Sequence, residues 1–100
     1  MKVEVGLPNE FALYQNYPNP FNPVTTITYA VPNFEGSGPT TVELRVYDAL
    51  GNEVKTLVSG VKEPGIHRAE LDCSGYASGI YFYRMTAGKF TAIKKLIVMK

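Results

Sequence analysis

Several residue types that site chemistry commonly uses are scarce in this chain. It has one cysteine, one histidine and no tryptophan. The lone Cys73 excludes an internal disulfide framework and a multi-cysteine zinc site. No stretch approaches the roughly 18 apolar residues of a membrane-spanning helix, and the opening MKVEVGLPNE lacks the apolar h-region of a signal peptide. We therefore expect residues 1–10 to be a linker, or a start added to an excised piece of a larger protein. Residues 11–100 are expected to be one domain. The alternative is that the chain is a cytoplasmic protein.

Catalytic and cofactor motifs are also missing. No GxGxxG or P-loop sequence is present to hold a phosphate. The surroundings of Asp48 and Asp72 lack the alternating acidic residues of a calcium loop, so we expect both to cap turns. Nothing in the sequence implies that Cys73 and His67 meet as a nucleophile–base pair; Cys73 is predicted to be small and half-buried, and His67 to be packed or hydrogen-bonded. We predict neither an enzyme nor a cofactor or metal site.

The residues that are plentiful favour β-structure. One hundred residues suffice for one core and not for two, and 45% hydrophobic with 19% charged residues is typical of a globular domain. Seven tyrosines, five phenylalanines and many β-branched residues favour strands. Alternation between turn signals predicts strands at residues 11–15, 25–31, 41–48, 53–59, 66–71, 80–87 and 89–100. We expect an all-β antiparallel sandwich of about seven strands, immunoglobulin-like or fibronectin III-like in outline.

The same alternation predicts which side chains point inward. These are Ile27, Tyr29 and Val31, then Val42, Leu44 and Val46, and then His67, Ala69 and Leu71. Tyr81 and Tyr83 alternate with Ile80 and Phe82, so at least one of these pairs must belong to the core. An outward tyrosine pair would leave open an aromatic platform for sugars or single-stranded nucleic acid.

The segment QNYPNPFNP, residues 15–23, combines three prolines with three asparagines. Proline has no N–H to give to a sheet, and it drives the residue before it into an extended conformation. We predict a corner at which the first strand leaves one sheet and the chain crosses to the other. Tyr17 and Phe21 would anchor this corner to the core, while the asparagines cap backbone groups.

The last predicted strand is apolar on both faces. Phe90, Ala92, Leu96 and Val98 share one face with Lys94, and Ile93, Ile97 and Met99 share the other with Lys95. A sandwich strand normally has one solvated face. Three explanations stay open: another element covers the second face, the strand is an adhesive surface that can add a strand from another chain, or a bulge at Lys94–Lys95 restores one-sided burial.

Acidic residues are absent from residues 73–100. That part contains Arg84, Lys89, Lys94, Lys95 and Lys100, a balance of +5, whereas residues 1–72 contain five Lys or Arg and nine Asp or Glu, a balance of −4. This asymmetry could steer a partner to the C-terminal end. The alternative is that solvated lysines discourage aggregation at a sheet edge.

Four blocks follow one another in a specific order: LYQNYPNPFNPVTTITYAVP, VELRVYDALGNEVKTLVSG, PGIHRAELD and ASGIYFYRMTAGKFTAIKKLIVMK. Together, over about residues 11–100, they resemble the type A C-terminal sorting domain of the bacterial type IX (Por) secretion system. The VYD-LG and SG-YFYR elements are also similar to the immunoglobulin-like domain of flagellar hook-capping proteins.

The resemblance implies a non-catalytic domain that directs a larger cargo protein through the outer-membrane translocon for release or cell-surface anchoring. It implies two sets of motif residues. The sorting or partner-binding set is Gly79, Tyr81, Gly88, Lys94, Lys95, Leu96, Ile97, Val98, Met99 and Lys100, and the structural set is Pro18, Asn19, Pro20, Phe21, Tyr47, Asp48 and Gly51. The chain departs from the family pattern at Asn52, where Arg or Lys is usual, and at Leu71, where an aromatic residue is common.

Partners and location follow from the same resemblance. The expected partners are the outer-membrane secretion machinery, an upstream cargo domain and a sortase-like protease, with no nucleic acid and no membrane insertion; weak self-association through the terminal strand stays open. The route would lead through the periplasm to the extracellular space or the outer-membrane surface. Two alternatives remain: an accessory ligand- or carbohydrate-binding sandwich, which needs exposed coplanar aromatics or a calcium-lined loop, and a self-associating assembly module like the hook-cap domain.

Overall fold

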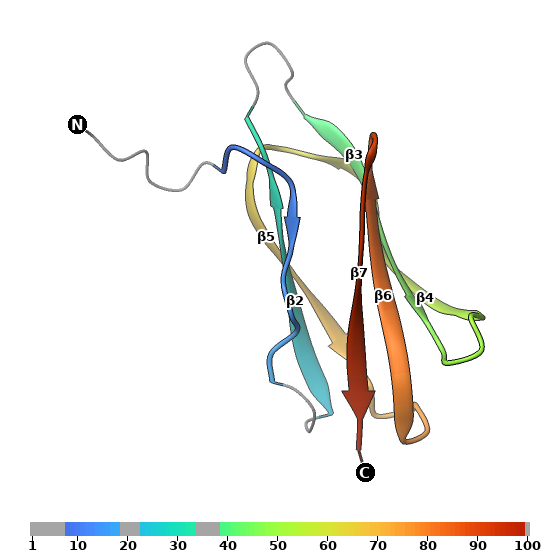
Figure 1. The fold of residues 1–100 in the computed structure, drawn as a ribbon. Helices are drawn as coiled ribbons and strands as arrows, with labels where there is room; N and C mark the ends of the chain where they lie inside the picture. Colours follow the sequence, from blue (N-terminus) through green and yellow to red (C-terminus); the bar gives the residue numbers. More distant parts are fainter. Residues whose placement is uncertain (1–7, 19–22, 34–38, 100) are drawn as a thin grey trace.

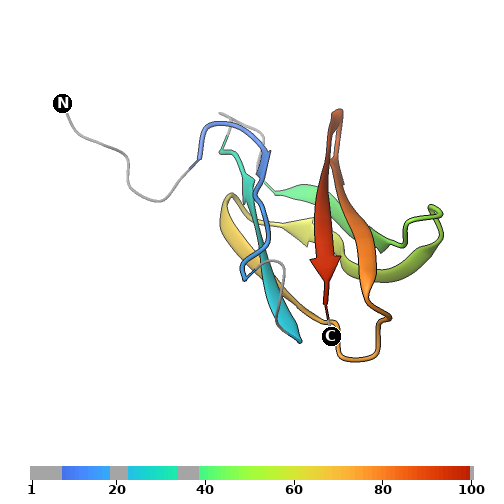
Figure 2. The ribbon, with the colours of Figure 1, turned by 60° about the horizontal axis from the view of Figure 1, so that its bottom comes forward.

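The computed structural model describes residues 8–18, 23–33 and 39–99, which form two antiparallel sheets packed face to face (Figures 1 and 2). The strands are β1 (Ala12–Leu13), β2 (Val24–Val31), β3 (Thr40–Tyr47), β4 (Glu53–Lys62), β5 (Gly65–Asp72), β6 (Gly79–Ala87) and β7 (Phe90–Val98). One sheet has the order β1-β2-β5 and the other the order β4-β3-β6-β7. The predicted all-β sandwich is confirmed.

Two strands differ clearly from their predicted bounds. β1 has two residues where five were expected, because the chain then turns into the proline-rich segment. β4 was expected to end at residue 59, because GVKEPG, residues 60–65, was predicted to be a turn. It instead continues through Gly60, which pairs with Val42, to Lys62, which pairs with Thr40.

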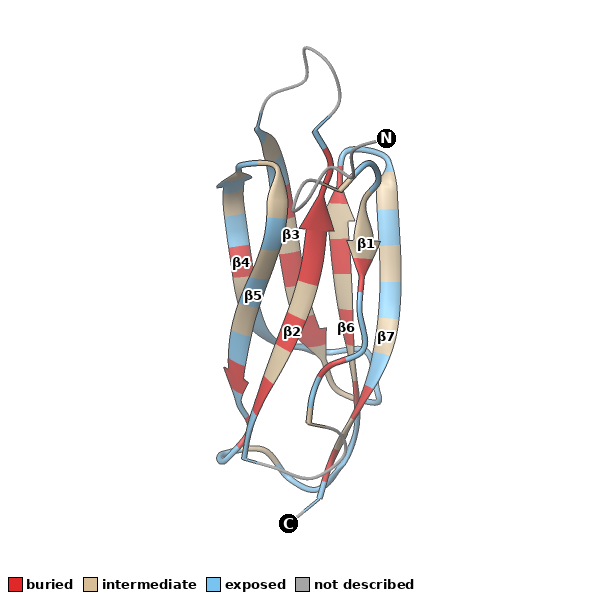
Figure 3. Ribbon diagram, turned by 90° about the vertical axis from the view of Figure 1, so that its left-hand side faces the viewer, coloured by how far each residue is buried: buried red, intermediate tan, exposed pale blue. Residues whose placement is uncertain are grey.

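The core lies between the two sheets and is made of alternate residues along the strands (Figure 3). The side chains predicted to point inward from β2 and β3 are at most 2% exposed, and Leu71 of β5 is 0% exposed. In β6, Tyr81 and Tyr83 are buried whereas Ile80 is 45% exposed. The tyrosine pair therefore belongs to the core, and the idea of a tyrosine platform on β6 is wrong.

The proline-rich segment does not cross between the sheets, contrary to the prediction. β1 and β2 pair in the same sheet, and the main chain of Tyr17 exchanges two hydrogen bonds with Thr26 of β2. The Tyr17 side chain is 79% exposed and is not a core anchor. Neighbouring side chains of an extended chain point to opposite sides, so the inward-facing Asn16 places Tyr17 outward. Phe21, the second predicted anchor, lies outside the described residues.

Asn16 holds this segment in place. Its side chain is 2% exposed, and its Nδ2 donates hydrogen bonds to Thr25 Oγ1 at 2.9 Å and to the Pro18 carbonyl at 3.2 Å. The Tyr83 hydroxyl donates to the Tyr14 carbonyl at 2.7 Å and so ties the segment to the opposite sheet. Buried polar groups destabilise a fold unless they are hydrogen-bonded. Within the described residues, the segment is thus fixed by satisfied polar groups and not by the side chain of Tyr17.

Residues 11–15, which lead into the proline-rich segment, lie beside β7, which is one edge of the four-stranded sheet. The Phe11 ring stacks on the ring of Phe90 with 5.4 Å between centroids, and Gln15 Nε2 donates to the Lys95 carbonyl at 2.7 Å. The Lys95 carbonyl therefore points away from β6, towards the edge along which residues 11–15 lie. Main-chain groups of strand residues repeat with a period of two, so those of Ile93 point to the same edge.

Candidate functional site

The last strand, β7, has apolar side chains on both of its faces in the structure, as the sequence predicted. β6 and β7 pair without a register shift from Gly79–Val98 to Ala87–Phe90, so the bulge considered at Lys94–Lys95 is wrong. Strict alternation places Lys94 half-buried in the inward row. A lysine is tolerated there because β7 is an edge strand, where a long side chain can carry its ammonium group to solvent.

A two-residue turn, Gly88 and Lys89, fixes the register of the hairpin. Gly88 has φ +60°, in the left-handed region, at the first position of the turn. This is the geometry of a type II′ turn, which matches the twist of paired strands and favours glycine at this position. Because a two-residue turn allows only one register of the two strands, it determines which side chains of β7 face outward.

The outward side chains of this hairpin combine apolar and basic groups, and no element among the described residues covers them. We call the apolar and basic members of these rows the outer hairpin face; they are Ile80, Phe82, Arg84, Ile93, Lys95, Ile97 and Met99, and Thr86 and Thr91 extend the same rows towards the turn. Ile80 is 45%, Ile93 59% and Met99 53% exposed. Within the described ranges, neither Arg84 nor Lys95 has a carboxylate at ion-pair distance; the ion pairs are those of Arg45 with Glu43 and Glu53.

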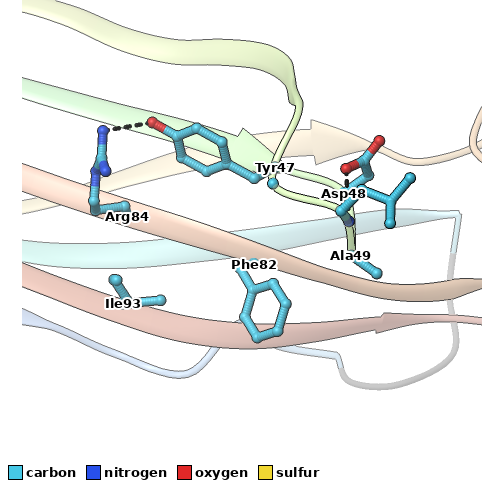
Figure 4. A pocket seen from close by; sticks show the side chains of 8 residues that line it. Tyr47, Asp48, Ala49, Phe82, Arg84 and Ile93 are labelled. Atoms are coloured by element: carbon cyan, nitrogen blue, oxygen red, sulfur yellow. Dashed lines mark hydrogen bonds between the residues drawn. The ribbon is translucent and has the colours of Figure 1, made fainter.

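A hollow of about 470 Å³ opens beside this face, where β3 ends (Figure 4). Its lining combines the end of β3 and the β3–β4 turn with β6 and β7, and consists of Tyr47, Asp48, Ala49, Leu50, Gly51, Phe82, Arg84 and Ile93. The Arg84 guanidinium donates to the Tyr47 hydroxyl at 2.6 Å and lies 5.0 Å from the centre of the Tyr47 ring. These two contacts hold the arginine at the wall of the hollow.

Asp48 shapes the turn that forms the rim of the hollow. Its Oδ1 accepts hydrogen bonds from the backbone N–H groups of Asn52 at 2.9 Å and Leu50 at 3.0 Å. The bond from Asn52 is the largest of the causes that lower the pKa of this carboxyl below its ordinary value. Gly51 completes the turn with φ +92°, a conformation that suits glycine. The prediction that Asp48 caps a turn is confirmed.

Comparison with known families identifies the chain. A family model described as a secretion system C-terminal sorting domain matches residues 15–99. The chain belongs to this family. It is a sorting-signal family of type IX secretion and not a catalytic one. No curated protein was found to match the chain.

In the structure of the sorting domain, some of the predicted partner-binding residues are exposed and others are buried. Lys95 and Met99 are exposed on the outer hairpin face, where Ile97 is half-buried. Leu96 and Val98 are buried in the core, so their side chains point away from that face. Tyr81 is buried as well and donates its hydroxyl hydrogen bond to the Ala77 carbonyl at 2.8 Å. Gly79 begins β6 and Gly88 makes the hairpin turn, while Lys100 lies outside the described residues.

The structural motif residues of the sorting domain fall into two groups. Tyr47, Asp48 and Gly51 meet at the hollow. The Pro18 carbonyl accepts hydrogen bonds from Asn16 and Thr25, whereas Asn19, Pro20 and Phe21 lie outside the described residues. At the two departures from the family pattern, Asn52 closes the β3–β4 turn and Leu71 is fully buried in the core.

The hollow itself was not predicted. Leu50, Phe82 and Arg84 line it; they lie within the VYD-LG and SG-YFYR elements but were not predicted to be site residues. Cross-strand neighbours in β3, β6 and β7 bring them together: Tyr47 pairs with Phe82, and Arg84 pairs with Ile93. The pattern of alternation could have placed Phe82 and Arg84 on an outer face, but only the order of the strands shows that this face adjoins the turn that holds Leu50.

The remaining residues considered for chemistry are structural. The His67 ring stacks on Tyr29 with 5.2 Å between centroids, and its Nε2 lies 2.7 Å from the Glu63 carbonyl oxygen, which confirms the prediction of a packed, hydrogen-bonded histidine. Cys73 is 2% exposed and so more deeply buried than predicted. In the part of the chain that the structure describes, no three His, Cys, Asp or Glu gather as a metal site, and no helix has the length and hydropathy to span a membrane.

Proposed function

We propose that the outer hairpin face is the address by which the outer-membrane secretion machinery recognises this sorting domain and carries the upstream cargo through the translocon. The observation that supports the proposal is the division of β7. Leu96 and Val98 are buried and hold the fold, whereas Ile93, Lys95 and Met99 are exposed. A grouped apolar surface rimmed by charge is a common mark of an interaction site.

The position of the cargo supports the same proposal. Phe11 stacks on Phe90, so residue 11, where the domain is predicted to begin, lies beside the start of β7. Val98 ends that strand, about 27 Å farther along at the usual rise per strand residue. A cargo joined upstream therefore leaves the C-terminal end of the hairpin accessible to a partner (Figure 1).

Charge favours a partner with an anionic surface. Residues 73–100 contain no Asp or Glu, and Arg84 and Lys95 on the outer hairpin face have no acidic ion-pair partner among the described residues. Complementary potentials speed association and exclude wrong partners. We propose that the cargo meets this partner from the periplasm, and that a sortase-like protease then removes the domain when the cargo is released or anchored at the surface.

A secretion assay tests the proposal. A signal peptide and fluorescent reporter are fused to residues 1–100 in a host with type IX machinery. Deleting the last strand is unsuitable because Leu96 and Val98 are core residues, so a truncated domain is expected to unfold. The test variant is instead Lys95→Glu with Met99→Ser, and the matched control is Lys55→Glu, which reverses the charge of an exposed lysine in β4.

The wild type and the control should reach the surface or the medium, while the double variant stays in the periplasm with an unchanged circular dichroism spectrum. Retention of the wild type itself would count against the sorting function. Secretion of the folded double variant at the wild-type level would show that the address lies elsewhere on the domain.

A further inference from the structure

We propose that the hollow beside the β3–β4 turn binds an acidic, apolar peptide segment of the secretion machinery. A bulky apolar side chain of the partner enters the hollow, and a carboxylate beside it meets Arg84 and Lys95. This inference rests on the proposed function, because it assigns a partner chemistry to the same face of the domain.

The lining of the hollow suits an apolar group. Phe82, Ile93 and the ring of Tyr47 contribute apolar surface, and Leu50 projects from the turn with 88% of its surface exposed. The turn does not require leucine at that position, since its hydrogen bonds come from Asp48 and from backbone groups. The volume of about 470 Å³ lies within the range of sites that bury small ligands.

The charges around the hollow call for a carboxylate. Arg84 uses one donor for the Tyr47 hydroxyl, and its planar guanidinium has further donors that match a carboxylate. Lys95 is the cross-strand neighbour of Phe82 and so flanks the apolar floor. Neither cation has an acidic ion-pair partner among the described residues, whereas the carboxylate of Asp48 is engaged within its own turn.

The number of basic residues favours a peptide over an anionic membrane. Membrane-binding segments typically gather about four to eight basic residues, whereas the described residues of this face include two, Arg84 and Lys95. Residues 11–15 lie along the β7 edge from Phe90 to Lys95, so the partner peptide is expected to bind through its side chains on the outer hairpin face and not by strand addition.

The inference is tested by titrating a peptide into ¹⁵N-labelled residues 1–100 and following the amide resonances by NMR. The probe is a blocked six-residue peptide that alternates glutamate with leucine or phenylalanine. One control peptide has lysine in place of glutamate, a second has serine in place of the apolar residues, and phosphatidylglycerol vesicles form a third arm. We expect the acidic apolar peptide alone to shift the resonances of residues 47–51, 82–84 and 93–95.

Matched variants locate the binding. Leu50→Ser and Arg84→Gln should each weaken binding about tenfold, the loss expected when a well-placed contact is removed. Val61→Ser, at an apolar residue that is 65% exposed in β4, and Lys89→Gln, at an exposed lysine in the hairpin turn, should leave it unchanged. Equal binding of the lysine peptide, shifts outside the hollow, or binding of vesicles without binding of the peptide would each overturn the inference.

The secretion assay separates this inference from the proposed function. If the wild-type fusion is secreted and the Leu50→Ser and Arg84→Gln fusions are secreted equally well, the hollow is not part of the address although the sorting function stands. If the wild-type fusion is retained, the sorting function fails, and the titration still decides whether the hollow has the proposed chemistry.

Discussion

The side chain of Asn16 is the polar anchor of the segment between β1 and β2. Asn16→Ala removes its hydrogen bonds to Thr25 and Pro18 and leaves buried polar groups with fewer partners. We expect a loss of about 1–3 kcal/mol in the free energy of unfolding, measured by urea denaturation. Tyr17→Ala serves as the control, because Tyr17 is 79% exposed and its loss should change stability by less than about 0.5 kcal/mol. Equal losses in the two variants would contradict this account.

Tyr83 makes stability depend on alkaline pH. Its side chain is 0% exposed, and burial raises the pKa of its phenol from 10.0 to about 12. Between these values the unfolded chain loses the proton and the folded chain keeps it. The contribution to stability is therefore complete below about pH 10 and is lost as the pH rises towards 12. A rise of two pKa units corresponds to a contribution of no more than about 2.7 kcal/mol to the free energy of unfolding.

Urea denaturation at pH 8 and pH 11 measures this dependence. The wild type should lose more stability over this interval than Tyr83→Phe, which keeps the buried ring and has no phenol proton. Burial also raises the pKa values of Tyr29 and Tyr76, so part of the dependence should persist in the variant. Identical losses in the two proteins would rule out Tyr83 as a source.

Gly51 is required for its backbone and not for its size. It has φ +92°, and a Cβ at this position would meet nothing within 4 Å. Gly51→Ala should therefore cost about 1 kcal/mol from backbone strain alone, measured by thermal unfolding. Gly75 also has open space around it but is not in the left-handed region. Gly75→Ala should be neutral or slightly stabilising, and a loss as large as that at Gly51 would argue against backbone strain.

Among the elements, β7 has one face packed in the core and the other exposed to solvent, since its side chains alternate with a period of two. Leu96→Ala, at a residue 1% exposed, should cost about 2–5 kcal/mol of stability. Ile93→Ser, at a residue 59% exposed, should change stability by less than about 0.5 kcal/mol yet lower secretion of a fused reporter. Denaturation curves and the secretion assay together check this division. If Ile93→Ser unfolds the domain, the outer side of β7 is structural.

For the molecule as a whole, one core shared by both sheets predicts a single cooperative unfolding transition. Side chains of both sheets belong to it, including Tyr29 from β2 and Tyr83 from β6. The chain has no tryptophan, so the near-ultraviolet circular dichroism should come chiefly from buried tyrosines. Its thermal transition should coincide with that of the far-ultraviolet signal, which follows the strands. Separate midpoints would mean that the two sheets come apart independently.

Patterns within short stretches of the sequence were sufficient to predict most of the fold and to indicate the family. Alternation and turn residues predicted the strands, the buried faces of β2 and β3 and the buried Leu71 of β5, because the direction of a side chain in a strand depends on its parity alone. His67 and Ala69, by contrast, are half-buried. The four ordered blocks indicated the sorting domain, and Asp48 with Gly51 indicated the β3–β4 turn, because capping and backbone conformation act within a few residues.

Tertiary structure decided what local pattern could not. Whether the second face of β7 was covered, bulged or exposed depended on the register with β6 and on which strands became edges. The anchoring role of Asn16 depended on β2 and on the opposite sheet, and the hollow depended on the order β3-β6-β7, which brings Leu50, Phe82 and Ile93 together from distant parts of the sequence. Such contacts arise from non-local strand pairing, and no periodicity within a single strand specifies which neighbour it will have.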